Sequence, residues 1–360
     1  MKRCLAFLML FSILLCGCEK QKATIVETEL PHSDFLVGLE PNLTDAPIPK
    51  NQNLLTGLPD LTEEAIGKRP VAVMINNVKG AMPQYGISQA DVIFEMPVEA
   101  NLTRLMALYA DYTQMPDICS IRSCRYYFPA VSEGFDAFYV HWGMDPSVKD
   151  YIASLNLDRY NGSSNTGKLF ARDKDRINAG YSLEHTAYFK GTQFAAAVAK
   201  AGKRTELTDD KKGTAFNFCP IDTLVTPTGD TCNTVTVKFG NATAGFTYDA
   251  ETKKYYKSFN GSPQVDGRSE EQLAFTNVIV LETNIWTRED RVHKGVDWAG
   301  NESTTGYYFS NGAMQKIHWY KENASEKGYL KFFDMDGNEL ELNRGKTYIA
   351  YTYANKTTWQ

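Results

Sequence analysis

The chain has 360 residues, of which 43% are hydrophobic and 22% charged, and its formal net charge is −5 at pH 7. This composition is ordinary for globular domains with hydrophobic cores, and the length suits two of them. Because the charge is negative and Lys and Arg form no basic run, the composition argues against nucleic acid as a partner.

The first 18 residues have the pattern of an export signal. Lys2 and Arg3 precede an apolar run over residues 5–15, which is too short for a membrane-spanning helix. The run ends in Leu15-Cys16-Gly17-Cys18, which resembles the lipobox of bacterial lipoproteins. The resemblance implies removal of residues 1–17 and lipidation of Cys18, whose acyl chains would anchor the protein stably on the outer face of the cytoplasmic membrane.

Residues 18–55 follow the signal and are polar, without hydrophobic periodicity. Four prolines interrupt them, at positions 31, 41, 47 and 49. Such a segment has little to bury, so we expect a flexible tether between Cys18 and the folded domains.

Residues 56–205 predict an α+β domain built on a mixed sheet. Short apolar, β-branched runs predict strands, and the second and third of these read as a hairpin. N-cap residues and an alanine-rich stretch predict helices. The expected strands cover 71–75, 91–96, 104–110 and 137–141, and the expected helices cover 120–132 (or 123–132), 145–155 and 193–201.

Residues 210–360 predict a mostly β domain, so the fold class of the whole chain is α+β. Alternating apolar positions and Asn-Gly or Asp-Gly pairs are typical of strands joined by tight turns. The expected strands cover 234–239, 255–259, 277–281, 306–309, 313–320, 329–334 and 348–353.

Several stretches, in this order along the chain, resemble the YerB-like lipoprotein family. They lie at 56–58, 69–77, 89–95, 103–104, 121–123, Arg125, 140–141, 277–280, 336–337 and 342–349. The resemblance covers nearly all of the mature chain and implies an anchored extracytoplasmic protein of Gram-positive type with two domains of unknown function. It implies no established chemistry.

Polar residues of the N-terminal domain gather at the expected strand ends, where backbone N–H groups and arginines suit a carboxylate or phosphate. We expect them either to line one ligand-binding cleft or to form ion pairs that hold strands and helix together. The candidate ligand-binding residues are Asn76, Asn77, Glu95, Glu99, Arg104, Arg122, Arg125 and His141.

Two functions fit these observations. The favoured hypothesis is a membrane-tethered binding or scaffold module of the cell envelope, with cell-wall assembly proteins or a wall polymer as partners. The alternative is a hydrolase-like enzyme that acts on a polar wall substrate in a cleft of the N-terminal domain, using Glu95, Glu99, Arg122 and His141. In a glycosidase-like form of this hypothesis, Glu95 and Glu99 would be the acid/base pair. No catalytic set is complete, and the spacing of the five histidines suggests neither a metal site nor a cofactor.

Four cysteines remain beyond Cys18, at positions 119, 124, 219 and 232. Cys219 and Cys232 flank a turn-forming segment, so they either form a disulfide or remain buried free thiols. Because it would restrict the unfolded chain, such a disulfide would add about 3 kcal/mol to the free energy of unfolding.

Overall fold

The structure is a computed structural model that describes residues 48–164 and 168–360. The predicted signal peptide (1–17), the lipidation site Cys18 and most of the predicted tether lie outside the described residues and remain predictions. At the end of the predicted tether the structure differs from expectation, because Leu54 and Leu55 are buried in the core. The carboxamide of Asn53 accepts the Leu55 N–H at 2.9 Å and fixes this turn.

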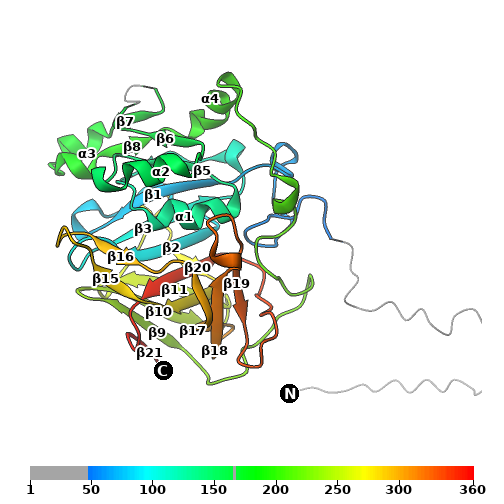
Figure 1. The fold of residues 1–360 in the computed structure, drawn as a ribbon. Helices are drawn as coiled ribbons and strands as arrows, with labels where there is room; N and C mark the ends of the chain where they lie inside the picture. Colours follow the sequence, from blue (N-terminus) through cyan, green and yellow to red (C-terminus); the bar gives the residue numbers. More distant parts are fainter. Residues whose placement is uncertain (1–47, 165–167) are drawn as a thin grey trace, which may run out of the picture. The chain divides into compact units, whose positions relative to one another are not determined.

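A ten-stranded sheet contains strands from both predicted domains (Figure 1). Its order is β19-β18-β17-β14-β20-β2-β3-β1-β5-β6. Strands β2 and β20 pair in parallel, from Val92 opposite Thr347 to Glu95 opposite Ala350. The predicted segments 56–205 and 210–360 therefore meet through backbone hydrogen bonds in the middle of one sheet. The ten strands are β1 Val71–Asn77, β2 Val92–Pro97, β3 Thr103–Tyr109, β5 Phe138–His141, β6 Arg159–Asn161, β14 Asn277–Glu282, β17 Gly300–Ser310, β18 Ala313–Lys321, β19 Leu330–Phe333 and β20 Thr347–Thr352.

The remaining strands form smaller sheets. A six-stranded antiparallel sheet comprises β9 Thr234–Phe239, β10 Ala242–Asp249, β11 Lys254–Phe259, β12 Ser262–Pro263, β13 Ala274–Phe275 and β21 Thr357–Trp359. A three-stranded sheet comprises β4 Ile118–Cys119, β7 Phe170–Arg172 and β8 Ala187–Phe189, and a hairpin pairs β15 Ile285–Thr287 with β16 Lys294–Val296. The helices are short: α1 Tyr127–Ser132, α2 Lys149–Ser154, α3 Lys174–Asn178 and α4 Phe194–Lys200.

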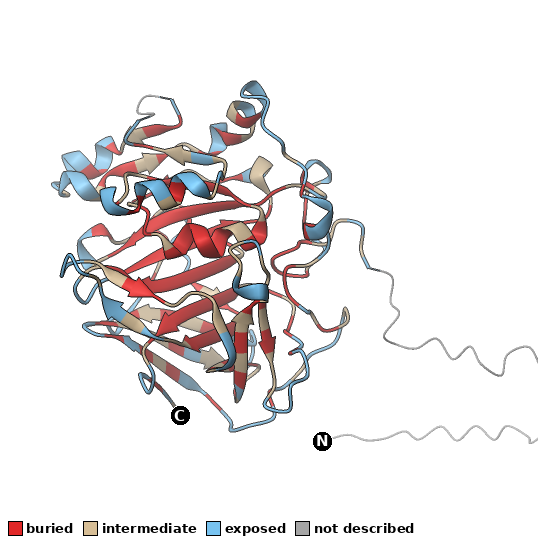
Figure 2. Cartoon of the chain, in the orientation of Figure 1, coloured by how far each residue is buried: buried red, intermediate tan, exposed pale blue. Residues whose placement is uncertain are grey.

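Both faces of the ten-stranded sheet are covered, which explains why β1, β2, β3 and β20 are buried along their whole lengths. One hydrophobic cluster packs the sheet against the six-stranded sheet, and Val73 and Phe246 belong to it. The other cluster lies on the opposite face and includes Phe128 of α1 and Ile152 of α2. Figure 2 shows the buried central strands and the exposed surfaces of the outer helices.

The α+β prediction is confirmed, and so is the hairpin of β2 and β3, which pair antiparallel. All seven strands expected after residue 210 are present, and the structure adds β10 between the first two. Asn311 and Gly312 both have positive φ, 47° and 72°, and make the tight turn between β17 and β18.

The expected helix at 120–132 is wrong in its first half. Residues 120–125 are extended, because Ile121 bridges to Ile75 of β1 and the Cys124 N–H donates to the Gly143 carbonyl. Only 127–132 is α-helical, so Arg122 and Arg125 do not share a helix face.

Cys219 and Cys232 are free and buried, which corresponds to the second of the two alternatives for this pair. Their thiols lie 3.3 Å from the carbonyl oxygens of Thr223 and Thr234, respectively. Within the described part of the chain, no helix has the length and apolar character needed to cross a membrane.

Candidate functional site

Glu95 lies in a closed polar network where the two halves of the chain, residues 56–205 and 210–360, meet. One carboxylate oxygen accepts from Asn77 Nδ2 at 2.9 Å and from the Thr103 hydroxyl at 2.8 Å. The other accepts from the Tyr348 hydroxyl at 2.8 Å and lies 3.3 Å from Lys257 Nζ. Glu95 and Lys257 are both 0% exposed. Burial lowers the pKa of Lys257 against the opposing effect of Glu95. A ligand has no access to this carboxylate, so its role is to join the two halves.

Glu99 forms ion pairs with two of the arginines that we predicted as site residues. Its Oε1 lies 2.8 Å from Arg104 Nη2, and its Oε2 lies 2.9 Å from Arg125 Nη2. Burial alone would raise the pKa of Glu99, but the charges of the two arginines outweigh it and hold the pKa below its ordinary value. Each arginine also donates to a loop carbonyl: Arg104 Nη1 lies 2.7 Å from that of Ser123, and Arg125 Nη1 lies 2.8 Å from that of Cys124. The triad therefore fixes the segment 120–125 against the start of β3.

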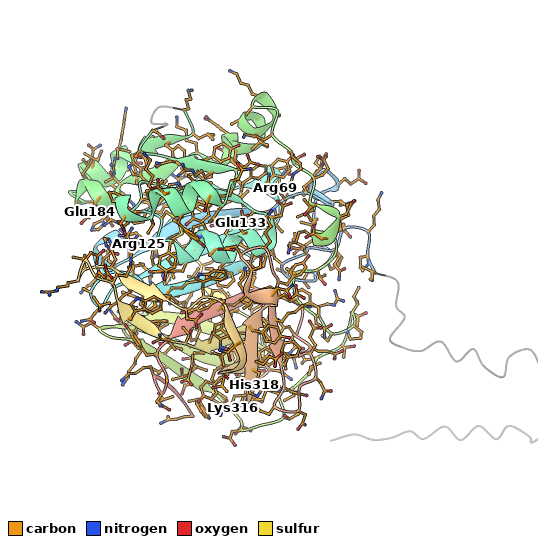
Figure 3. The ribbon with its side chains drawn as sticks, viewed as in Figure 1. Arg69, Arg125, Glu133, Glu184, Lys316 and His318 are labelled. Carbon is orange, nitrogen blue, oxygen red and sulfur yellow. The ribbon has the colours of Figure 1, made fainter. Side chains whose placement is uncertain are left out.

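Arg122 and Asn76 contact a different segment, around residues 184–185. Arg122 Nη2 forms an ion pair with Glu184 Oε2 at 2.8 Å, and Glu184 lies at the left edge of Figure 3, half exposed. Asn76 Nδ2 lies 3.0 Å from His185 Nδ1. Of the predicted groups, this one is the most open to water.

His141 is fully buried at the end of β5. Its Nδ1 donates to the Gly143 carbonyl at 2.8 Å, and its Nε2 has no hydrogen-bond partner among the described residues. Burial lowers the pKa of His141 to about 4, so the ring is neutral at pH 7. It therefore offers no positive charge to an anion.

The eight predicted residues thus form four hydrogen-bonded groups, which differs from the single polar cleft that we expected. Glu95 and Glu99 belong to separate networks, and neither carboxylate faces a shared open site. This geometry leaves the proposed acid/base pair without a place for a substrate between the two carboxyl groups.

Two open hollows lie farther out, beside the free edge of the ten-stranded sheet that β6 forms, and sequence reasoning missed them. The first has a volume of about 440 Å³ and is lined by Met144, Pro146, Lys149, Arg159, Asn161 and Ser164. His141 pairs in register with Asn161, so this hollow lies next to the carboxyl ends of the parallel strands β5 and β6. In the described part of the chain, neither Lys149 nor Arg159 forms an ion pair with a carboxylate. Strand β6 has only three residues, so its sequence carried too weak a signal to place these cations.

Residues of both halves also form an acidic cluster around Asp145. The side chains of Asp145, Asp290 and His293 bring potential metal-ligand atoms within 4.8 Å of one another. Arg288 Nη1, however, lies 2.7 Å from Asp145, and His293 Nδ1 lies 2.8 Å from Asp290. The ion pair with Arg288 and the hydrogen bond with His293 account for both carboxylates, so the cluster is a link between hairpin β15–β16 and the loop before α2.

Fold and site together define a two-part α+β protein whose halves share one sheet and a buried polar interface. The chain belongs to the family whose two parts are described as protein of unknown function (DUF3048) N-terminal domain, matched by residues 55–204, and DUF3048 C-terminal domain, matched by residues 235–349. This confirms the YerB-like resemblance.

Two relatives illustrate the match. The chain is 29% identical over 302 residues to the putative lipoprotein YerB of Bacillus subtilis (strain 168), covering 82% of this chain and 84% of YerB. The crystal structure of YerB protein from Bacillus subtilis is similar to this fold with a TM-score of 0.71 at 26% identity, covering 85% of this chain and 98% of that one.

Proposed function

We propose that this chain is a lipoprotein anchored through Cys18 on the outer face of the cytoplasmic membrane, where it acts as a binding or scaffold module for an anionic polymer of the cell wall. The anchor is supported by the leader pattern and by the name of the Bacillus relative. The binding role depends on one observation, the unpaired cations around the free edge of the ten-stranded sheet.

Residues 142–204, which surround that edge, contain ten Lys and Arg residues against six Asp and Glu, although the whole chain has a net charge of −5. Arg159 and Asn161 face one side of β6, and Tyr160 faces the other. Lys149 and Arg159 line the hollow on the first side, and Lys168, Lys190 and Lys200 border a second hollow that Tyr160 lines. A flexible polyanion could contact cations on both sides of this short edge strand, and its affinity would depend on salt.

The test is binding of poly(glycerol phosphate) to the chain from residue 18 with Cys18→Ser. We expect binding that weakens as salt rises from about 50 to 200 mM, because the contacts are electrostatic. The double variant Lys149→Glu/Arg159→Glu should lose about tenfold in affinity, since it replaces two attractive charges by two repulsive ones. The matched control is Lys174→Glu, an exposed lysine of α3 outside both hollows, which should change affinity by less than about twofold.

The proposal fails if the polymer does not bind at low salt, or if the control loses as much affinity as the double variant. Capture of a wall-assembly protein without polymer binding would also overturn the polymer as ligand. The hydrolase alternative depends on Glu95 and Glu99, and no observation favours it over binding.

A further inference from the structure

We infer that the second hollow, a groove beside α4, binds a single anionic amphiphile, a molecule with one aliphatic chain and a phosphate or carboxylate head. The inference rests on the proposed function and deepens it, because it names a ligand class for one side of the same cationic edge. The groove has a volume of about 750 Å³, and the helix that forms one wall lies at the top of Figure 1.

The local sequence of α4 creates the groove. Phe194 and Val198 point into the core and are 0% exposed, which fixes the helix against the sheet. Three of the positions that line the groove from this part of the chain, 196, 197 and 201, are alanine. Their small side chains leave a space that larger residues would fill.

Three more side chains add apolar surface to the lining, and Thr192 and Gln193 add uncharged polar groups. Leu169 and Phe170 lead into β7, and Tyr160 comes from the edge strand β6. The Tyr160 ring packs edge-on against Phe194, with ring centroids 5.1 Å apart, so the wall is held by the core and does not depend on a ligand. The interior of the groove can therefore accept an aliphatic chain but offers little to a fully hydrated anion.

The charged groups of the groove are all positive. Lys168, Lys190 and Lys200 line it, and none of them forms an ion pair with any carboxylate that the structure describes. Neighbouring cations differ in this respect, because Lys203 pairs with Asp158 at 2.8 Å and Arg204 pairs with Asp136 at 2.6 Å. Part of the positive charge left uncompensated in this layer therefore lies beside the apolar lining of the groove.

The apolar lining and the positive charge of the groove together indicate the class of ligand. A free phosphate would satisfy the lysines but leave the apolar lining in water, and a neutral lipid would cover the lining but leave the lysines without a counter-charge. A volume of about 750 Å³ lies within the range of small-molecule sites, roughly 300–1,000 Å³. One anionic head with one aliphatic chain matches both the charge and the lining.

The test measures binding of dodecyl phosphate below its micelle concentration, by titration calorimetry, to the chain from residue 18 with Cys18→Ser. We expect one molecule per chain, and at least about tenfold weaker binding of inorganic phosphate, which lacks the apolar part. Ala196→Trp fills the groove from an exposed position and should weaken binding by about tenfold or more. Ala199→Trp makes the same change on the same helix outside the groove and should alter affinity less than about twofold. Lys200→Glu reverses one rim charge and should also weaken binding by about tenfold.

The inference is overturned if dodecyl phosphate binds no better than inorganic phosphate, or if the two tryptophan variants behave alike while both keep the parent melting temperature. If Ala196→Trp has a lower melting temperature than the parent, the affinity of Lys200→Glu for dodecyl phosphate tests the inference in its place. Binding only to vesicles of anionic phospholipid, without binding of the monomeric probe, would also refute a groove for a single molecule.

Poly(glycerol phosphate) binding separates this inference from the proposed function. Loss of polymer binding in Lys149→Glu/Arg159→Glu, together with no dodecyl phosphate binding, would refute the groove alone. Dodecyl phosphate binding without polymer binding would refute the polymer alone.

Discussion

The buried Lys257–Glu95 pair gives the sharpest test of how the two halves are held together. The substitution Lys257→Met removes the ammonium group but keeps most of the aliphatic volume. Glu95 then remains 0% exposed with three neutral donors, from Asn77, Thr103 and Tyr348, and without a counter-charge. Removing one partner of a buried ion pair costs about 3–5 kcal/mol, against about 5–15 kcal/mol for the whole stability of a typical domain.

The double variant Glu95→Gln/Lys257→Met removes the charge from the site altogether. The amide oxygen introduced at position 95 could still accept from Asn77 and Thr103, so we expect a stability within about 2 kcal/mol of the parent, well above that of the single variant. Urea unfolding followed by tryptophan fluorescence gives the free energy of unfolding of all three chains.

The comparison of the single and double variants provides a check on the cause. The double variant separates the loss of charge from the loss of packing, because only the single variant leaves the carboxylate buried without a counter-charge. Two results would refute the view that an uncompensated charge destabilises Lys257→Met. One is a decrease of less than about 1 kcal/mol in its free energy of unfolding at pH 7, and the other is a double variant less stable than this single variant.

Three further predictions follow from the same contacts. Glu99→Gln leaves two nearly buried arginines without their carboxylate and should cost about 2–4 kcal/mol in urea unfolding, whereas the control Glu184→Gln, whose ion pair is largely exposed, should cost less than about 1 kcal/mol. Burial lowers the pKa of Lys321 to about 7, so the unfolded chain holds this proton to higher pH than the folded one does. Between pH 7 and 9 the free energy of unfolding of the parent should therefore rise by about 2 kcal/mol relative to that of Lys321→Met. If this difference did not rise, the lowered pKa would be contradicted. Residues 46–209 alone should give poorly dispersed amide NMR signals, because β2 loses its partner β20, and a well-dispersed spectrum would show that this half folds independently.

Local patterns predicted most of the elements but few of the contacts. Val71–Asn77 is apolar and β-branched over most of its length, and its strand follows from that pattern alone. The segment 120–125 shows where the pattern failed: serines at 120 and 123 suit helix N-caps, but pairing with β1 and with the loop at Gly143 holds the chain extended. Tertiary hydrogen bonds from distant segments outweighed a weak local preference.

The candidate site was less predictable because its partners are far apart in the sequence. Nothing near Glu95 indicates that Lys257 and Tyr348 will surround it, and burial of that carboxylate depends on the pairing of β2 with β20. Glu99, Arg104 and Arg125 are closer in sequence, and their mutual pairing was one of the two expected outcomes.

The same contacts explain where a ligand should be sought. The stretches by which the chain resembles its family include Glu95, Arg104, Arg125 and Tyr348, and each of these four side chains is already engaged in an internal polar network. A buried carboxylate that binds a lysine and a tyrosine of the other half specifies how the halves dock, and it has no remaining site for a substrate. Cations that form no ion pair within the described part of the chain line the two hollows instead: Lys149 and Arg159 line one, and the three lysines line the α4 groove. These five residues belong to none of those stretches. The recognisable motifs therefore account for the architecture, and the binding that we propose depends on the cations beside the edge strand β6.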